Sequence, residues 1–309
     1  MNAAVLQNNF RSGMVAIVGR PNVGKSTLLN RILNKKITIV SPVPQTTRNQ
    51  VRGIYNDQRG QIVFIDTPGL HFGRDNLDRF MNQSAYGVAS DADCLVYLTD
   101  ATVPVGKEEQ SIAERLGGLK VPVILGLNKV DKGDRFIPAY IELWEKVKGK
   151  PLTGLKDCVL LPLSATGDIH IDKLIDILLD HLPPGPPLYP SDMHSDTPQK
   201  MAMADIVREK LFHTLRQEIP HALAVIIEDI QPGKKKLLHV RALILVEHLS
   251  QKKIVIGRDG AVLKKVGMEA RHELEALLGH KIFLEIFVKT KRNWRDDYSV
   301  LEEMGYVYE

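Results

Sequence analysis

A short stretch near the start of the chain has the residue types of a phosphate-binding loop. It runs from Gly19 to Ser26 and matches the pattern G-x-x-x-x-G-K-[ST]. An apolar run precedes it, as in a buried strand, and a helix-like segment follows it. A strand, a glycine-rich loop and a helix in this order place backbone N–H groups around a polyphosphate. The predicted phosphate site comprises Gly19, Arg20, Pro21, Asn22, Val23, Gly24, Lys25, Ser26 and Thr27.

The residues of this loop suggest separate roles. Gly19 and Gly24 permit the tight turn and the close approach of the backbone to the phosphates. Lys25 is expected to reach the β- and γ-phosphates and to act in catalysis, and the Ser26 hydroxyl is expected to ligate Mg²⁺. The alternative is a glycine-rich turn that binds nothing. We disfavour it because further nucleotide-binding motifs follow in the expected order.

A second motif indicates which base is bound. An apolar, strand-like run ends in the sequence Asn-Lys-Val-Asp at positions 128–131. The Asp131 carboxylate can accept hydrogen bonds from the guanine N1–H and the exocyclic amine. Adenine lacks this donor pair and would leave a buried acceptor unpaired, at a cost of about 1–3 kcal/mol. Asn128 is expected either to contact the base edge or to tie its loop to the phosphate loop. The stem of Lys129 is expected along the base face, and the backbone of Ser164-Ala165 is expected to contact the guanine carbonyl oxygen. The motifs therefore predict a site for GTP and GDP.

A third motif predicts the magnesium site. Asp66-Thr67-Pro68-Gly69 follows a strand-like run, so Asp66 can hold the magnesium shell and the Gly69 N–H can turn toward the γ-phosphate. Upstream, a Pro-broken segment carries the sequence Gln-Thr-Thr-Arg at 45–48, where a first switch loop is expected. One threonine hydroxyl should complete the magnesium shell. We slightly favour Thr47 over Thr46. Both loops are expected to order on the γ-phosphate.

The residue after Gly69 is Leu70, where GTPases such as Ras have a glutamine that orients the attacking water. Leucine cannot do this, so the water must be positioned otherwise. Asn22 suggests one way, because in related GTPases an asparagine here helps to hold K⁺ beside the phosphates and so stabilises the transition state. The alternative is that Asn22 only caps the loop. Arg48 and Arg74 lie in switch-like segments, and we interpret both as surface residues.

Composition limits the broad class of protein. No apolar run approaches the roughly 20 residues of a membrane span, and the N-terminus lacks the pattern of a secretory signal. The two cysteines, Cys94 and Cys158, have no metal-binding spacing, which is typical of reduced thiols in a cytoplasmic protein. Residues 200–295 carry 19 Lys/Arg and 11 Asp/Glu, and this basic excess suggests a polyanionic partner.

Periodicity and proline content predict two domains. Strand-like and helix-like segments alternate from Met14 to His181, with one of the helices expected at about 81–90. This alternation indicates a mostly parallel sheet with helices on both faces. A proline-dense stretch then interrupts the pattern. We therefore expect an α/β P-loop GTPase domain at 12–182, a linker at 183–200 and a second domain at 201–309.

The second domain has the element order of a type II KH domain, an α+β RNA-binding fold. A helix, two long strands at 222–230 and 237–249 and a short helix from Lys252 lead to Gly257-Arg258-Asp259-Gly260, and a helix and a strand follow. This G-x-x-G loop would clamp the RNA backbone, since two glycines let phosphates approach closely. Ile254, Val255, Ile256, Val262 and Leu263 would form the floor under the bases. The predicted RNA contacts are Ile256, Gly257, Arg258, Asp259, Gly260, Lys264 and Lys265. The alternative is a packing domain whose glycines only form a turn.

In combination these motifs resemble the Era family of bacterial GTPases over nearly the whole chain. The resemblance implies binding near the 3′ end of 16S-type small-subunit rRNA, a role in assembly of the small ribosomal subunit, and peripheral association with the inner face of the cell membrane. No sequence feature indicates the membrane association. A monomer is expected. Trp294, Tyr298 and Tyr306 are expected to pack a C-terminal tail helix, with RNA contact as the alternative.

A second hypothesis is a constitutive RNA-binding scaffold in which GTP only stabilises the fold. Intact Lys25, Ser26, Asp66 and Asp131 argue against it. RNA affinity that differs between the GTP and GDP states would distinguish a switch from a scaffold, because a ligand without differential affinity shifts no equilibrium.

Overall fold

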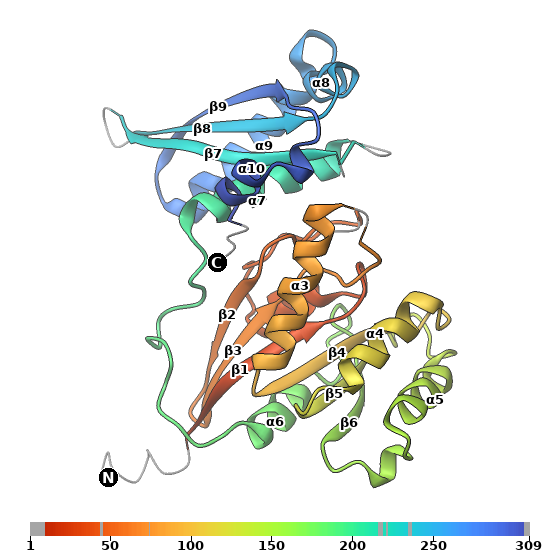
Figure 1. The fold of residues 1–309 in the computed structure, drawn as a ribbon. Helices are drawn as coiled ribbons and strands as arrows, with labels where there is room; N and C mark the ends of the chain where they lie inside the picture. Colours follow the sequence, from red (N-terminus) through yellow and green to blue (C-terminus); the bar gives the residue numbers. More distant parts are fainter. Residues whose placement is uncertain are drawn as a thin grey trace, which may run out of the picture. The chain divides into compact units, whose positions relative to one another are not determined.

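The structure is a computed structural model that describes residues 10–43, 46–73, 75–215, 219–220, 222–233 and 237–305. They form two compact units (Figure 1). The first extends mainly to Asp196, and the second consists of residues from Thr197 onward with two short earlier segments, Ser41–Thr46 and Asp75–Leu77. Each unit is described here by itself.

The first unit contains a six-stranded sheet in the order β2-β3-β1-β4-β5-β6. Only β2 and β3 pair antiparallel, and all other neighbours are parallel. This confirms the predicted mostly parallel sheet. The strands are β1 (Arg11–Val18), β2 (Val51–Asn56), β3 (Gly60–Asp66), β4 (Cys94–Asp100), β5 (Val123–Asn128) and β6 (Cys158–Pro162).

Helices cover both faces of this sheet. On one face, α2 (Lys25–Ile32) and α6 (Ile171–His181) share a core with alternate residues of β1, β3 and β4. On the other face, α3 (Asn76–Asp91), α4 (Lys107–Gly117) and α5 (Ile137–Lys148) pack on the intervening residues. Helices α3 and α4 cross in front of the sheet in Figure 1. A 3₁₀ turn, η1 (Leu152–Gly154), precedes β6. Because parallel strands end at one edge, the motifs that follow β1, β3 and β5 come together there.

Helix α3 begins earlier than the sequence analysis predicted. We expected a helix at about 81–90, but it starts at Asn76. Leu77, Met81, Ala85 and Ala89 recur every four residues and are all buried. The buried stripe extends the helix one turn farther toward the N-terminus. The turn-forming residues after Pro68 had suggested a later start.

Part of the proline-rich stretch lies along the first unit. The buried side chain of Gln61 accepts hydrogen bonds from the backbone N–H groups of Leu188 (2.6 Å) and Tyr189 (2.9 Å) and donates one to the Tyr189 carbonyl (2.8 Å). Farther on, Ser195 forms a bridge with Gly53 of β2. These contacts hold residues 188–195 against the sheet edge, whereas the sequence had suggested a spacer.

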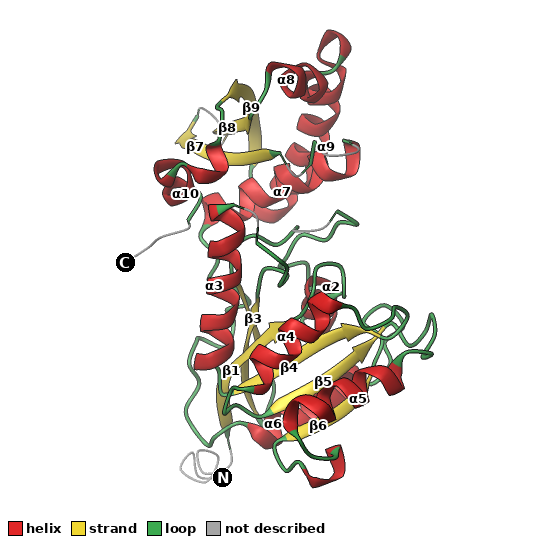
Figure 2. Cartoon of the chain, turned by 45° about the vertical axis from the view of Figure 1, so that its right-hand side comes forward, coloured by secondary structure: helices red, strands yellow, loops and turns green. Residues whose placement is uncertain are grey.

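The second unit is a three-stranded sheet in the order β7-β8-β9, covered on one face by helices (Figure 2). β8 pairs antiparallel with β7 and parallel with β9. The element order is the predicted one. The elements are α7 (Gln199–Thr214), β7 (Leu223–Pro232), β8 (Leu237–Val246), α8 (Leu249–Ile256), η3 (Arg258–Gly260), α9 (Ala261–Leu278), β9 (Lys281–Thr290), η4 (Trp294–Asp296) and α10 (Tyr298–Glu303).

The end of β8 and the start of α8 differ from the prediction. We expected the second strand to reach Leu249, but the Gln251 side chain accepts hydrogen bonds from the backbone N–H groups of Glu247 and His248 (both 2.9 Å). This capping arrangement ends β8 at Val246 and starts α8 at Leu249.

The C-terminal tail contains the short helix α10. Trp294 is fully buried, and its ring N–H donates to the Ala222 carbonyl at 3.1 Å. Trp294 therefore packs as expected, whereas Tyr298 is exposed. Tyr306 lies outside the described residues. Among the described helices, none is both long enough and apolar enough to cross a membrane.

Candidate nucleotide and RNA sites

The phosphate loop joins β1 to α2 and can be built only with glycine at two positions. Gly19 has φ of 151°, and a Cβ there would lie 2.1 Å from the Leu98 carbonyl oxygen. Gly24 has φ of 106°, and its Cβ would lie 2.4 Å from the Asn128 amide nitrogen. Larger residues would therefore be strained and would clash. Gly24 is also the N-cap of α2, so the loop presents the N-terminus of that helix to an anion.

Lys25 is folded back over this loop. Its ammonium group donates to the carbonyl oxygens of Gly19 (3.0 Å) and Arg20 (2.9 Å), and only 6% of the residue is exposed. Burial lowers the pKa of Lys25 to about 8, although Asp66 and Glu109 oppose the shift. A nearby phosphate would supply the missing negative charge and keep the ammonium group protonated.

Three oxygen-bearing side chains meet beside the loop. Ser26 Oγ lies 2.8 Å from Thr47 Oγ1 and 2.7 Å from Asp66 Oδ2, and Thr47 Oγ1 lies 3.4 Å from the same carboxylate oxygen. Asp66 is fully buried, and its Oδ1 has no hydrogen-bond partner among the described residues. Burial raises the pKa of Asp66 to about 6 against the opposing effects of Lys25, Ser26 and Thr47. These residues fit Mg²⁺, which binds one or two protein oxygens together with phosphate and water.

The geometry also distinguishes the two switch threonines. Thr46 Oγ1 donates to the Val43 carbonyl oxygen at 2.6 Å, so its hydroxyl is already engaged. Thr47 is the residue whose hydroxyl lies at the oxygen cluster. The structure therefore favours Thr47 as the magnesium ligand.

Three loops meet at the predicted guanine site, and Asn128 joins two of them. Its amide nitrogen donates to the Val23 carbonyl (2.7 Å), and its oxygen accepts from the Ala165 N–H (3.1 Å). Ser164 donates its hydroxyl to Asp131 Oδ1. Asp131 is exposed, so its carboxylate remains accessible to a base. Lys129 is anchored by the Asn22 carbonyl (2.7 Å) and is placed to cover one base face.

Sequence reasoning missed two carboxylates at this site. Asp100, at the end of β4, holds the Lys129 ammonium group at 2.5 Å. Glu108 of α4 binds Arg20 Nε through one oxygen (2.8 Å) and accepts the Phe72 N–H through the other (3.1 Å). Asp100 ends a strand next to β5, which is a detectable signal, whereas nothing local identifies Glu108.

The segment after Asp66 contacts the phosphate loop closely. Thr67 donates its hydroxyl to the Ile17 carbonyl at 2.9 Å, and a Cβ on Gly69 would lie 2.7 Å from the Pro21 nitrogen. The Leu70 N–H donates to the Gly19 carbonyl at 3.0 Å, and its side chain is fully buried in the core with α3 and α4. Leu70 therefore points away from the phosphate site.

Asn22 and Arg48 were also candidates near the phosphates. Asn22 adopts φ of 63°, a left-handed conformation that asparagine tolerates well. Arg48 was expected on the surface but is only 1% exposed, so that expectation is wrong. Arg74 lies outside the described residues.

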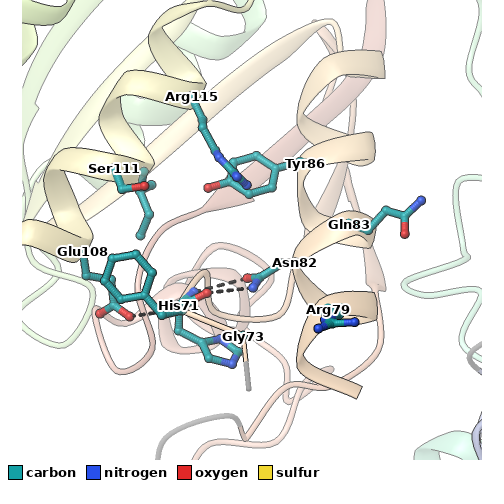
Figure 3. Close-up of a pocket in the computed structure, with 11 residues that line it drawn as sticks. His71, Gly73, Arg79, Asn82, Gln83, Tyr86, Glu108, Ser111 and Arg115 are labelled. Atoms are coloured by element: carbon teal, nitrogen blue, oxygen red, sulfur yellow. Dashed lines mark hydrogen bonds between the residues drawn. The ribbon is translucent and has the colours of Figure 1, made fainter. Parts of the chain in front are cut away.

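A cavity of about 440 Å³ opens beside the segment that follows Gly69 (Figure 3). His71 and Gly73 form one side, and residues of α3 and α4 form the others. Asn82 holds the backbone of His71 through two hydrogen bonds, of 3.2 and 2.7 Å, and Arg115 lies 5.1 Å from the centre of the Tyr86 ring. The segment after Asp66 is the expected second switch, so the shape of this cavity must change if that segment moves.

The G-x-x-G loop lies between α8 and α9 and is open to solvent. The side chains of Arg258 and Asp259 are 97% and 93% exposed. Gly257 has φ of 76° and ψ of 171°, a region that only glycine adopts readily, and Gly260 is the left-handed N-cap of α9. Backbone N–H groups at the start of α9 can thus meet a phosphate.

A groove follows this loop between α9 and β9, with a volume of about 320 Å³. The predicted residues Leu263 and Lys264 line it, and Lys265 is exposed on the same helix. Val255 is fully buried in the core, so it cannot contact a base as expected. The sequence analysis missed the remaining lining residues because they come from farther along α9 and from β9: Gly267, Met268, Arg271, Phe283, Leu284 and Ile286.

Comparisons with known proteins agree with both sites. A family model described as "50S ribosome-binding GTPase" matches residues 14–129, and a KH domain model matches residues 218–295. The GTPase Era of Halothermothrix orenii is 40% identical over 299 residues, which cover 96% of this chain and 99% of that protein.

Two solved Era structures match almost the full chain. One is Era in complex with MgGDPNP and nucleotides 1506–1542 of 16S ribosomal RNA, with a TM-score of 0.90 and 36% identity over 97% of this chain and 100% of that one. The other is a single-residue variant of Aquifex aeolicus Era bound to GDP and AlF4⁻, with a TM-score of 0.89 and 37% identity over the same shares. With its phosphate, magnesium and guanine motifs assembled at one sheet edge and a KH domain following in the sequence, the chain belongs to the Era family of GTPases.

Proposed function

We propose that this protein binds GTP with Mg²⁺, hydrolyses it to GDP and phosphate, and binds single-stranded small-subunit rRNA near its 3′ end. In this role it acts as a switch in assembly of the small ribosomal subunit. The observation that carries the proposal is the cluster of Ser26 and Thr47 at Asp66 Oδ2, beside the buried Oδ1 of the same carboxylate, which has no hydrogen-bond partner among the described residues. The solved relative that binds MgGDPNP and 16S rRNA supports it.

For hydrolysis, water attacks the γ-phosphorus and the bond to the β-phosphate oxygen breaks. Bound Mg²⁺ would neutralise charge on the phosphate oxygens. Lys25 and the backbone N–H groups of the loop would hold the same oxygens in place. Leu70 stands where other GTPases have a glutamine, and its buried side chain cannot orient water. Turnover without a partner is therefore expected to be slow, on the order of 10⁻⁴ to 10⁻² s⁻¹.

Thr47 and Glu108 provide the nucleotide-sensing contacts. The Thr47 hydroxyl belongs to the magnesium cluster, so loss of the γ-phosphate would release the first switch. Glu108 joins Arg20 of the phosphate loop to the Phe72 backbone of the second switch. A change in either loop would therefore reach the other through this carboxylate.

We further propose that Asn22 helps to hold K⁺ beside the phosphates. Asn22 lies in the phosphate loop with a left-handed backbone, and Lys129 binds its carbonyl oxygen at 2.7 Å. The cation would take the role of an arginine finger and stabilise the charge that develops in the transition state. The expected result is faster hydrolysis in potassium than in sodium buffer. Equal hydrolysis rates in the two buffers would contradict the proposed K⁺ site.

The proposed switch is tested by RNA affinity in two nucleotide states. The full-length protein is titrated onto a short RNA copying the 3′ end of small-subunit rRNA, at fixed salt because phosphate-driven affinity is strongly salt-dependent. GDP is compared with a non-hydrolysable GTP analogue. Tight binding that depends on the nucleotide supports the switch. Tight binding that does not depend on it supports the constitutive scaffold, and affinity equal to that for a scrambled RNA contradicts the proposed target.

We also propose a monomer located in the cytoplasm, with peripheral association with the inner face of the cell membrane. The support is the resemblance to the family and the cysteine usage, without a membrane-binding feature in the sequence. Cell fractionation tests the location, and sedimentation of the purified protein tests the monomer.

A further inference from the structure

The face of the second sheet opposite its helices carries exposed aromatic side chains. Along β9, Ile282 and Val288 are buried toward the helices, whereas Phe283 and Phe287 are 49% and 46% exposed. Alternate residues of a strand point to opposite sides of the sheet. The two phenylalanines therefore lie on the outer face.

Phe283 is paired with a second ring. It lies beside His239 of β8 in the parallel register, and their ring centres are 5.2 Å apart. His239 is also exposed. The next position along the strands is polar, with Arg241 opposite Glu285, and it separates this pair from Phe287. We call Phe283 and His239 the ring pair.

The ring pair adjoins the RNA groove. Phe283 lines the groove at the end farthest from the G-x-x-G loop, together with Arg271 of α9, whereas Phe287 does not line it. Arg271 is exposed, whereas the neighbouring Lys281, although its side chain is 80% exposed, is ion-paired with Glu275 at 2.9 Å. A strand of RNA that leaves this end of the groove thus meets two aromatic rings and the positive charge of Arg271.

We propose that the ring pair is a stacking site for a nucleobase of single-stranded RNA beyond the nucleotides held in the groove. Arg271 would lie against an adjacent phosphate. A KH loop clamps about four nucleotides, and unstacked bases bind exposed aromatic faces in single-stranded RNA recognition. The inference rests on the proposed function, since it requires that the groove binds RNA.

Binding of RNAs of different lengths tests this site. Nested oligoribonucleotides copying the 3′ end of small-subunit rRNA are shortened from each end, and their affinity for the full-length protein with a GTP analogue is measured by fluorescence anisotropy. For the unmodified protein, affinity should increase when the RNA extends past the groove. Phe283→Leu, which keeps apolar area but removes the π-face, should lose that gain, about 5- to 150-fold in Kd. Phe283→Trp should keep it.

Phe287→Leu is the matched control. Phe287 has similar exposure on the same strand face but does not line the groove, so its substitution should leave affinity unchanged at every length. A 2-aminopurine placed at the extra nucleotide should be quenched by the unmodified protein and less so by Phe283→Leu. Because Phe283 is half-exposed, thermal unfolding should be almost unchanged in both leucine variants.

The outcomes separate this inference from the proposed function. If Phe283→Leu has no effect, or weakens the shortest RNA as much as the longest, the stacking site is refuted while RNA binding stands. If the unmodified protein binds none of these RNAs, the proposed function fails, and the ring pair is not an RNA site. A Phe287→Leu variant that matches Phe283→Leu would indicate a general apolar surface, such as one for a protein partner.

Discussion

Replacing Asn128 with alanine should weaken both the fold of the first unit and its affinity for guanine nucleotides. Asn128 is 2% exposed and makes two hydrogen bonds, to the Val23 carbonyl at 2.7 Å and from the Ala165 N–H at 3.1 Å. Alanine would leave both backbone groups buried and unpaired. Each such group costs about 1–3 kcal/mol, so the expected loss is about 2–6 kcal/mol. That is a large part of the roughly 5–15 kcal/mol that stabilises a domain.

Urea unfolding of nucleotide-free protein measures the loss. Trp144 is buried in the core of the first unit and reports its transition by fluorescence, provided that both proteins also carry Trp294→Phe. GDP affinity is measured separately by calorimetry. We expect a lower unfolding midpoint and an affinity reduced at least tenfold, because the phosphate loop and the Ala165 loop lose their shared anchor.

Asn82→Ala is a suitable control for this experiment. Asn82 also makes two side-chain bonds to backbone, both to His71, but it is partly exposed and lies away from the guanine loops. It should cost less stability and leave GDP affinity unchanged. The reasoning is refuted if Asn128→Ala changes the unfolding free energy by less than about 0.5 kcal/mol, which is the range of ordinary surface substitutions. It is also refuted if both variants lose GDP affinity equally.

Three further predictions concern the base, the second switch and the RNA loop. Asp131→Asn should shift preference from GTP to xanthosine triphosphate, because the side chain at position 131 then presents an inverted pattern of donors and acceptors to the base. Competition binding measures this preference, and an unchanged preference for GTP would contradict the role assigned to Asp131. Burial alone would lower the pKa of His71, but hydrogen bonds to Asp78 and the Gly69 carbonyl oxygen raise it. The stabilisation by His71 should therefore be full below about pH 6.5 and lost as the pH rises through the folded-state pKa. The difference in unfolding free energy between the unmodified protein and His71→Gln should shrink from pH 6 to pH 9. A difference that stays constant over this range would count against a charged His71. Gly260→Asp should abolish RNA binding and spare GTP hydrolysis, because the new charge repels phosphate. Its Cβ would meet no atom within 4 Å, so the added strain is only that of a non-glycine residue at φ of 75°. Adding Gly257→Asp should give the same result with greater strain, because its Cβ would also lie 2.6 Å from Val262.

The sequence by itself determined the two folds and most of the nucleotide site. The phosphate loop, Asp66 and Asp131 were identifiable because each motif is contiguous and follows an apolar strand. Parallel strands bring such strand ends to one edge, so the order of elements was enough to predict that these motifs meet. The KH order of elements was readable for the same reason: local periodicity separates strands from helices.

Only the tertiary structure distinguished between similar candidate residues. Thr46 and Thr47 are nearly equivalent in the sequence, but Thr46 donates its hydroxyl to the Val43 carbonyl, whereas the Thr47 hydroxyl lies beside Ser26 at the proposed magnesium site. Glu108 lies 36 residues from Phe72 along the chain, and Phe283 reaches the RNA groove only because β9 packs beside α9. Side chains brought together by packing across such separations leave no local pattern. Contiguous motifs could therefore be read from the chain, whereas these partners required the fold.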